Sequence, residues 1–194
     1  MLRTYKYKLY NTKKLNHIHR TINIAGIIYN HCISLHKRYY KLYGKHLNKF
    51  QLQKHLTKLK KRDKYSYWNK LGSQAIQNIT ERIDEGYKKF YKKQGGLPSF
   101  KKVSKYKSFT LKGKIGYKLE DNIISLNGYK YKFWKSREIN GKVKTVTIKR
   151  DNIGDFYICI SLEIEESKYN ITSGKTVGID FGLSKFLSLS DKTD

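Results

Sequence analysis

The segment Leu15–Leu42, LNHIHRTINIAGIIYNHCISLHKRYYKL, decides the fold of the first half of this 194-residue chain. Its apolar and aromatic residues recur at steps of three and four, the spacing of one face of an α-helix. These residues are Leu15, Ile18, Ile22, Ala25, Tyr29, Cys32, Leu35, Tyr39 and Leu42. Gly44 follows them, and a glycine commonly ends a helix. The sequence therefore predicts one long amphipathic helix whose buried stripe includes Cys32.

The segments on either side of this helix also have regular patterns. Residues 3–10 alternate between apolar or aromatic side chains and basic or polar ones, which predicts a strand with one basic face. Asn48 can cap a second helix, which has apolar residues at Leu52, Leu56 and Leu59. A third helix follows, and its buried stripe consists of Ile76, Ile79, Ile83, Tyr87 and Phe90. The helical half then ends at Gly95-Gly96.

The second and third helices are open to two interpretations. Two basic helices after a capped turn are typical of a helix-turn-helix, which would place side chains such as Gln77 or Arg82 in a DNA groove. A glutamine there can form two hydrogen bonds to an adenine edge. A plain three-helix bundle with a polar face explains the same pattern equally well.

The second half of the chain is predicted to be β. Short segments rich in Tyr, Ile, Phe and Trp alternate with turn signals, and Asn127-Gly128 is the strongest of these signals. Asp121-Asn122 and Asn140-Gly141 mark two more turns. The expected strands are 106–111, 115–119, 123–126, 129–134, 144–148 and 156–165. The fold class is therefore α+β: a small, closed or nearly closed antiparallel barrel that residues 3–10 complete, with the helices inserted between.

Composition indicates a polyanionic partner. The chain has 42 Lys and Arg against 15 Asp and Glu, a net charge of +27, which favours binding to nucleic acid. Its 17 Tyr, 8 Phe and 2 Trp are interleaved with the lysines, and such rings can stack on exposed bases. An AT-rich genome also raises Lys and Tyr together, but it does not by itself explain the scarcity of acidic residues.

The location of the protein follows from what the sequence contains. It has no run of about eighteen apolar residues, so no membrane span is expected. Cys32 and Cys159 are far apart and have no zinc-ligand spacing around them. We therefore expect two reduced, packed thiols in a cytoplasmic protein.

A carboxylate near the end of the sequence is the candidate for chemistry. In Val177-Gly178-Ile179-Asp180-Phe181-Gly182-Leu183 an apolar run leads into Asp180 and turns at Gly182, which predicts a β-hairpin with Asp180 at the end of its first strand. Asp180 could bond to the turn backbone. It could also belong to a phosphate-binding hairpin like that of actin-like and Hsp70-like ATPases, or be the first carboxylate of a RuvC-type, RNase H-like nuclease.

The order of motifs decides between the last two. The motifs are Tyr5–Asn11, Ile28-Tyr29-Asn30, Ser73–Gln77, Lys89-Phe90-Tyr91, Leu97–Lys101, Gly141–Thr147 and Val177–Leu183. In this order and spacing they resemble TnpB, the transposon-encoded RNA-guided endonuclease related to type V CRISPR effectors. The resemblance covers essentially the whole chain.

The resemblance implies three domains. Residues 1–11 and 100–166 would form a wedge barrel, residues 12–99 an inserted helical recognition domain, and residues 172–194 the start of a RuvC nuclease domain with a partial RNase H-like hairpin. In this family the first two parts hold a guide RNA and read a short motif of the double-stranded DNA target.

Individual residues can then be given expected roles. Gln77 resembles a motif reader, and Gln51, Gln53 and Thr110 are weaker matches; Ser73 stands where the family often has a basic residue. We place Arg82 with these DNA-binding residues. We expect the guide RNA to contact Lys101, Lys102, Lys149 and Arg150.

Asp180 corresponds to the first catalytic carboxylate, which in the family binds Mg²⁺. A RuvC centre needs three carboxylates around two metal ions, and this sequence supplies one on a hairpin. We expect binding without cleavage, unless a second polypeptide supplies the rest, and weak order or docking elsewhere for residues 172–194. The alternative is a guide-independent helix-turn-helix DNA-binding regulator of a mobile element.

Overall fold

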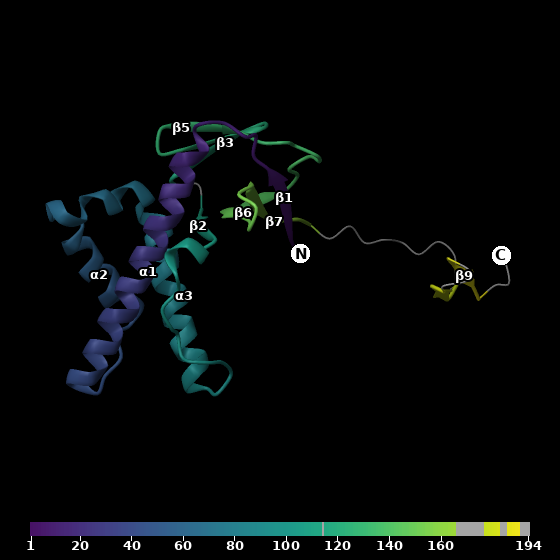
Figure 1. Cartoon of the computed structure of the whole chain (residues 1–194). Helices are drawn as coiled ribbons and strands as arrows, with labels where there is room; N and C mark the ends of the chain where they lie inside the picture. The colour runs from purple at the N-terminus through teal and green to yellow at the C-terminus, as the bar shows by residue number, and fades with distance from the viewer. Residues whose placement is uncertain (114, 166–176, 183–185, 191–194) are drawn as a thin grey trace. The chain divides into compact units, whose positions relative to one another are not determined.

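The computed structural model describes residues 1–113, 115–165, 177–182 and 186–190. The chain separates into two compact units, Met1–Ile164 and Glu165–Asp194, which we describe one at a time. The first unit combines helices with antiparallel sheets, so the predicted α+β class is confirmed (Figure 1). None of the helices in the described part of the chain is both long enough and apolar enough to cross a membrane.

The helical part contains the three predicted α-helices. Helix α1 (Leu15–Tyr43) has 29 residues and ends at Gly44, whose φ of 62° is left-handed, as the sequence predicted. Helix α2 (Lys49–Leu59) begins at a capping box in which the side chains of Asn48 and Gln51 satisfy each other's backbone N–H groups. Helix α3 is Ser73–Tyr91.

The connection between α2 and α3 differs from the predicted helix-turn-helix. A 3₁₀ helix of 9 residues, η1 (Asp63–Leu71), stands between them and buries Trp68 and Leu71. A DNA-binding helix-turn-helix has a turn of about three or four residues. The two helices therefore pack through an intervening segment and are not joined by the short turn of a helix-turn-helix, which favours the three-helix interpretation of these residues.

The strands of the first unit form two antiparallel sheets among its described residues. The first has the order β1-β7-β6-β2 and the second the order β3-β4-β5. An isolated bridge between Leu9 and Phe133 joins them, and the N–H of Tyr10 donates to the carbonyl of Lys132 at 2.9 Å. The bounds are β1 Leu2–Lys8, β2 Ser108–Lys112, β3 Tyr117–Glu120, β4 Ile123–Leu126, β5 Tyr129–Lys132, β6 Lys142–Arg150 and β7 Phe156–Glu163.

The predicted hairpin turn at Asn127-Gly128 connects β4 to β5. Both residues have positive φ, 49° and 83°. This is the conformation that favours Asn-Gly in two-residue hairpins. Strand β1 lies beside β7, so the N-terminal strand joins the sheet with the helices inserted after it, as predicted. Closure of the two sheets into a barrel stays a prediction.

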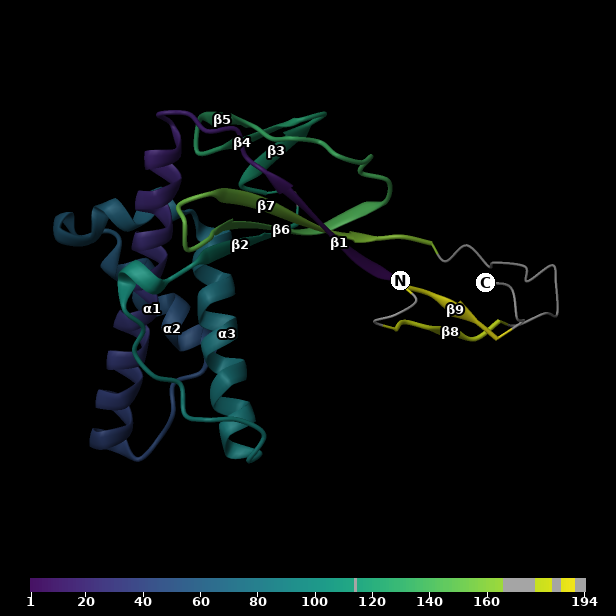
Figure 2. The same ribbon diagram turned by 45° about the vertical axis from the view of Figure 1, so that its right-hand side comes forward.

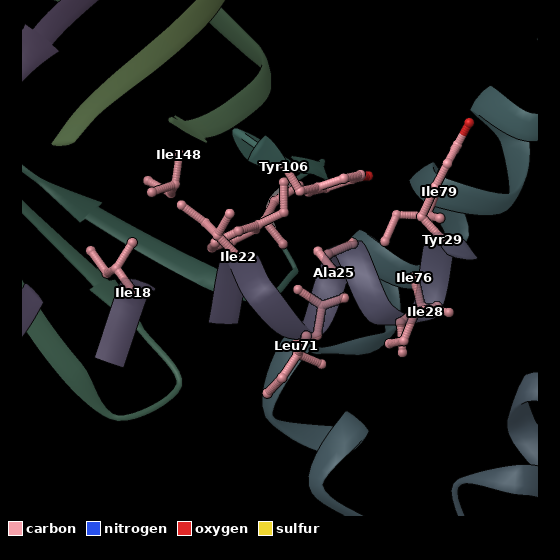
Figure 3. Close-up of a cluster of buried hydrophobic side chains, with 14 of the residues drawn as sticks. Ile18, Ile22, Ala25, Ile28, Tyr29, Leu71, Ile76, Ile79, Tyr106 and Ile148 are labelled. Carbon is pink, nitrogen blue, oxygen red and sulfur yellow. The ribbon is translucent and has the colours of Figure 1, made fainter. Parts of the chain in front are cut away.

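One continuous core joins the helices to the first sheet (Figure 3). Ile18 and Ile22 of α1 lie near Ile148 of β6 in the close-up, while Ala25 and Ile28 lie beside Leu71. Cys32 is fully buried in this core, and burial raises the pKa of its thiol to about 12. The predicted packed thiol at Cys32 is therefore confirmed.

A second stripe of α1, which we name the α1 seam, contacts residues that follow the helices in sequence. The seam residues recur at steps of seven, four and seven, so they share one helix face. A short 3₁₀ helix, η2 (Val103–Lys105), lies within the segment that returns to this face. The seam pairs are His19 with Arg150, Gly26 with Tyr106, Asn30 with Lys101, and Lys37 with Phe100.

Each seam contact is specific in its chemistry. The side-chain amide of Asn30 donates to the carbonyl of Lys101 at 2.8 Å and accepts from its N–H at 2.9 Å. A Cβ on Gly26 would lie 3.0 Å from the Cβ of Tyr106, so only glycine lets this ring pack on the helix without displacement. The seam thus fixes where the connector after α3 runs (Figure 2).

Two histidines meet between α1 and α2. The Nε2 atoms of His31 and His55 are 3.0 Å apart, so one ring donates to the other and at least one is neutral. Burial, helped by the neighbouring charges, lowers the pKa of both rings. The charge of Arg38 contributes to the lowered pKa of His31, and that of Arg62 to the lowered pKa of His55. Tyr65 and Trp68 pack beside His31.

We predict that the first unit loses stability as the pH falls below about 6.5, the ordinary histidine pKa. The pKa values of five histidines, His17, His19, His31, His36 and His55, are lowered mainly by burial. The unfolded chain therefore binds protons first, and stability is lost as the pH falls through the folded-state values. Urea denaturation at pH 7.5 and 5.5 measures this, and His55→Asn should reduce the difference. A His55→Asn protein with an unchanged pH dependence would contradict the assignment.

Candidate nucleic-acid interface

Helices α2 and α3 enclose a groove of about 270 Å³. We name it the α2–α3 groove. Its wall on α2 follows the helical spacing opposite the buried leucines, and its wall on α3 is the first turn of that helix and the next. The lining residues are Phe50, Gln53, Lys54, Thr57, Lys60, Ser73, Ile76 and Gln77.

The groove brings together two of the predicted DNA-reading residues. The Nε2 of Gln53 donates to the Oγ1 of Thr80 at 3.1 Å, and this hydroxyl donates to the carbonyl of Gln77 at 2.8 Å. These two hydrogen bonds hold the Gln53 amide against α3. Gln77 is exposed, and its side chain has no hydrogen-bond partner among the described residues. Its amide is thus available to a base edge.

Gln51 lies outside the groove. Its Oε1 accepts from the N–H of Asn48 at 2.9 Å, and its own N–H donates to the Oδ1 of Asn48 at 3.0 Å. The structure therefore uses Gln51 to begin α2. The sequence contained this signal, because a glutamine three residues after an asparagine is the spacing of a capping box.

The groove also has positive charge that the sequence analysis missed. Lys54 and Lys60 of α2 line it together with Ser73, the residue that stands where the family often has a basic one. The available signal was the three- and four-residue spacing of Phe50, Lys54 and Thr57 opposite the apolar stripe of α2. Two lysines from the facing helix thus bring ammonium groups to the groove that Ser73 lines.

An ion pair connects α3 to the first sheet. Lys112 of β2 binds Glu81, which lies one helical turn after Gln77. Thr110 lies two residues before Lys112 and therefore on the same face of β2. Its Oγ1 is 2.8 Å from that of Thr147 on β6. The predicted readers Gln77 and Thr110 consequently lie on neighbouring elements, α3 and β2, which the Glu81–Lys112 ion pair connects.

The outer face of the first sheet is polar and basic. Lys6 of β1 lies opposite Cys159, and its Nζ lies 3.9 Å from the ring centroid of Tyr157. Lys149 is exposed on the same face and pairs with Tyr157 across β6 and β7. Burial raises the pKa of the half-buried thiol of Cys159, and the charges of Lys149 and Lys6 partly offset that rise. The expected RNA contact Lys149 is thus accessible.

Arg150 is placed differently from its neighbour. It is 5% exposed, and its guanidinium donates to the carbonyls of Tyr106, Val103 and Ser104 at 3.0 to 3.2 Å. We therefore leave it out of the RNA-contact set, because its donors hold η2 against the sheet. Strand parity could have shown this, since Arg150 lies two residues after the buried Ile148.

A second pair of cations lies where the connector crosses α1 and α3. The Nζ of Lys101 is 4.9 Å from the ring centroid of Tyr29. Partial burial lowers the pKa of Lys101, and the like charge of Arg82 lowers it further. Two close cations of this kind are a favourable place for a phosphate. Arg82 and Lys102 are both exposed. The predicted DNA contact Arg82 and the predicted RNA contact Lys102 are therefore accessible.

Asp180 belongs to the second unit. Strands β8 (Ile179–Asp180) and β9 (Ser188–Leu189) form the predicted hairpin pairing, with Asp180 opposite Ser188 and exposed. No group of three or more His, Cys, Asp or Glu side chains could hold a metal ion in the part of the chain that the structure describes. A single carboxylate does not fit Mg²⁺, which needs several oxygen ligands. Residues 172–176, 183–185 and 191–194, where weak order was expected, lie outside the described residues.

We predict that two substitutions at adjacent positions, Arg150→Ala and Lys149→Ala, differ strongly in their effect on stability. Arg150→Ala leaves three buried carbonyls without their donors and should lower the free energy of unfolding by about 3 kcal/mol. Lys149→Ala removes an exposed side chain and should change it by less than about 0.5 kcal/mol. Urea denaturation of both variants is the measurement. Equal denaturation midpoints would contradict the placement of Arg150.

Comparison with known proteins found a family model and two proteins that resemble parts of this chain. The family model of the OrfB_IS605 helix-turn-helix domain matches residues 1–45. These residues form β1 and α1, so the matched region is not the α2–α3 pair to which we assigned the helix-turn-helix pattern.

Two known proteins match over more of the chain. "Putative RNA-guided DNA endonuclease InsQ" from Escherichia coli (strain K12) is 32% identical over 122 residues, which is 62% of this chain and 30% of InsQ. The cryo-EM structure of the Cas12f1–sgRNA–target DNA complex matches with a TM-score of 0.48 and 14% identity, over 100% of this chain and 55% of that chain. The domain match and the InsQ match agree with the order of motifs in the sequence, which resembles that of TnpB-type proteins. The chain spans 30% of the length of InsQ.

Proposed function

We propose that this chain binds a guide RNA and a double-stranded DNA target, and that the α2–α3 groove reads a short motif of the duplex. The observation that carries this proposal is the convergence of Gln53 and Gln77 on one groove that Lys54 and Lys60 also line. Glutamine amides read base edges, while lysines position the phosphate backbone. The name of InsQ, an RNA-guided DNA endonuclease, supports the same kind of function.

The guide RNA is assigned to the basic surface outside this groove. Lys149 lies on the polar face of the first sheet, and Lys101 and Lys102 lie on the connector. In this proposal residues 1–11 and 100–166 act as the wedge barrel, residues 12–99 as the recognition domain, and residues 172–194 as the start of the nuclease domain. Arg82 and Thr110 extend the DNA surface from the groove.

A guide-independent DNA-binding regulator is the second candidate, favoured by the helix-turn-helix match over residues 1–45. The two candidates differ in their requirement for RNA. A regulator would prefer one duplex sequence in the absence of RNA, whereas an RNA-guided protein would show its preference only when loaded. In both cases affinity should fall steeply with salt, because lysines displace counterions from phosphates.

We predict that Gln77→Ala reduces the preference for the best duplex motif about tenfold or more, because one bidentate base contact is lost. The motif is first selected from a randomised duplex library with the RNA-loaded chain. Lys54→Ala should instead weaken binding to every sequence and reduce the salt dependence by about one phosphate contact. Gln51→Ala should lower stability by about 1 kcal/mol through the lost cap and keep the sequence preference. A preference lost in Gln51→Ala but kept in Gln77→Ala would contradict this assignment.

We propose further that residues 1–194 alone bind the target but do not cut it. Asp180 is one exposed carboxylate, and the chemistry of a RuvC centre requires three around two ions. The chain's own Asp180 would be one ligand of Mg²⁺ in a centre whose remaining carboxylates lie outside residues 1–194.

The expected result is no cleavage of a target plasmid when the chain is incubated with guide RNA and Mg²⁺, although a gel shift shows binding. Cleavage should appear when a polypeptide that carries the remaining carboxylates is added, and Asp180→Asn should abolish it without changing binding. Robust cleavage by the chain alone, lost in Asp180→Asn, would sink the proposal.

A further inference from the structure

The far end of the helical part carries a pocket that the proposed function does not use. The C-terminal ends of α1 and α3 lie together at the end of the bundle away from the sheets (Figures 1 and 2). Between them is a cavity of about 400 Å³ with walls that include Tyr40, Phe90 and Tyr91. We name it the distal pocket. A neighbouring hollow of about 570 Å³ shares Tyr40 and Tyr91 with it.

The walls of the distal pocket are aromatic and reach the solvent. Tyr40 is 54% exposed, Tyr91 52% and Phe90 38%. Leu97, from the connector, is 50% exposed and lines the same cavity. Exposed rings around a cavity mark a binding surface more often than single exposed apolar residues do.

The charge around the pocket has one sign. Segments 36–46 and 87–97, which form its walls and rim, contain eight Lys and Arg residues and no Asp or Glu. Lys37 and Lys45 line the two hollows directly. Two carboxylates precede this segment on α3: Asp84 is already bound by Lys88 at 2.8 Å, and Glu85 is exposed. This combination of rings and cations suits a polyanion with flat apolar groups.

Two buried polar atoms favour an occupant that can form hydrogen bonds. His36 and Tyr87 are 2% and 4% exposed, line the distal pocket and stack with their ring centroids 3.7 Å apart. The Nε2 of His36 and the Oη of Tyr87 have no hydrogen-bond partner among the described residues. Both atoms are covered in this structure. A nucleobase edge that displaced the covering side chains would satisfy them, whereas an apolar peptide would not.

We propose that the distal pocket binds an unpaired nucleobase of a single-stranded polynucleotide. The base stacks on Tyr40 or Tyr91, and the lysines of the rim hold the flanking phosphates. Stacking of this kind tolerates any base, because each has a flat π-face. The site uses no residue of the α2–α3 groove, so it stands or falls separately from the proposed reading of the duplex.

The test measures binding of the full chain to 20-nucleotide single strands that carry one 2-aminopurine, as RNA and as DNA. Tyr40→Ala/Tyr91→Ala should weaken binding about tenfold or more and abolish the quenching of 2-aminopurine fluorescence. Tyr40→Phe/Tyr91→Phe keeps both rings and should bind like the natural chain. Tyr43→Ala is the matched control, because Tyr43 is 62% exposed at the end of the same helix but lines neither hollow. A stronger effect with RNA points to an unpaired guide segment, and a stronger effect with DNA to a displaced strand.

The proposal is overturned if the double alanine variant binds single strands as tightly as the natural chain. It is also overturned if Tyr43→Ala loses as much affinity, or if the double variant only converts a dimer to a monomer in mass photometry. Cross-linking of the natural chain to a 5-iodouracil strand gives a second readout that needs no variant. Cross-links to Tyr40, Phe90 or Tyr91 support the proposal, and cross-links confined to other residues reject it. Duplex binding should be unchanged in the double variant and is reduced only by the groove variants.

Discussion

The α1 seam is the constraint on which the rest of the first unit depends. Its four residues share one helix face and contact two later segments, the connector at residues 100–106 and the end of β6 at Arg150. The pairing of Asn30 with the backbone of Lys101 is specific, because one side-chain amide both donates to the carbonyl and accepts from the N–H of the same residue, as a neighbouring strand would. Without it the connector would lose a specific anchor on its path from α3 to β2, while the shared core would still join the sheet to the helices.

This constraint explains why motifs far apart in the sequence belong together. The Tyr29–Asn30 motif and the Leu97–Lys101 motif, which both carry the resemblance to TnpB, meet in space. The hydroxyl of Tyr29 donates to the carbonyl of Ser99 at 3.1 Å, and Gly86 of α3 leaves room for Pro98, whose Cγ would lie 3.1 Å from an added Cβ. Once the connector is fixed, β2 lies beside α3 and the Lys112–Glu81 ion pair can form. The groove and the polar face of the sheet thereby become neighbouring surfaces.

Local pattern was enough to predict the elements but not their contacts. The period of α1, the cap at Asn48 and the Asn127-Gly128 turn each depend on a few neighbouring residues, and each agrees with the structure. The nine-residue η1 was missed because its 3₁₀ turns have no long apolar period. The seam was missed because it depends on residues more than 60 positions apart, although an isolated glycine such as Gly26 inside a helix is itself a sign of close packing.

Among the site residues, strand parity could have separated Arg150 from Lys149, and the capping-box spacing could have separated Gln51 from Gln77. The approach of Lys54 and Lys60 to Ser73 could not be predicted in this way, because it depends on the tertiary structure.

The central claim is that one continuous surface, the α2–α3 groove with the outer face of the first sheet and the connector, holds nucleic acid. Lysine acylation footprinting of the chain with and without guide RNA and target duplex tests it most directly, with mass spectrometry as the readout. The account predicts that Lys54, Lys60, Lys102 and Lys149 lose reactivity, while Lys118 and Lys130, which are exposed on the second sheet, keep it. Equal protection of both sets, or protection confined to the second sheet, would contradict it.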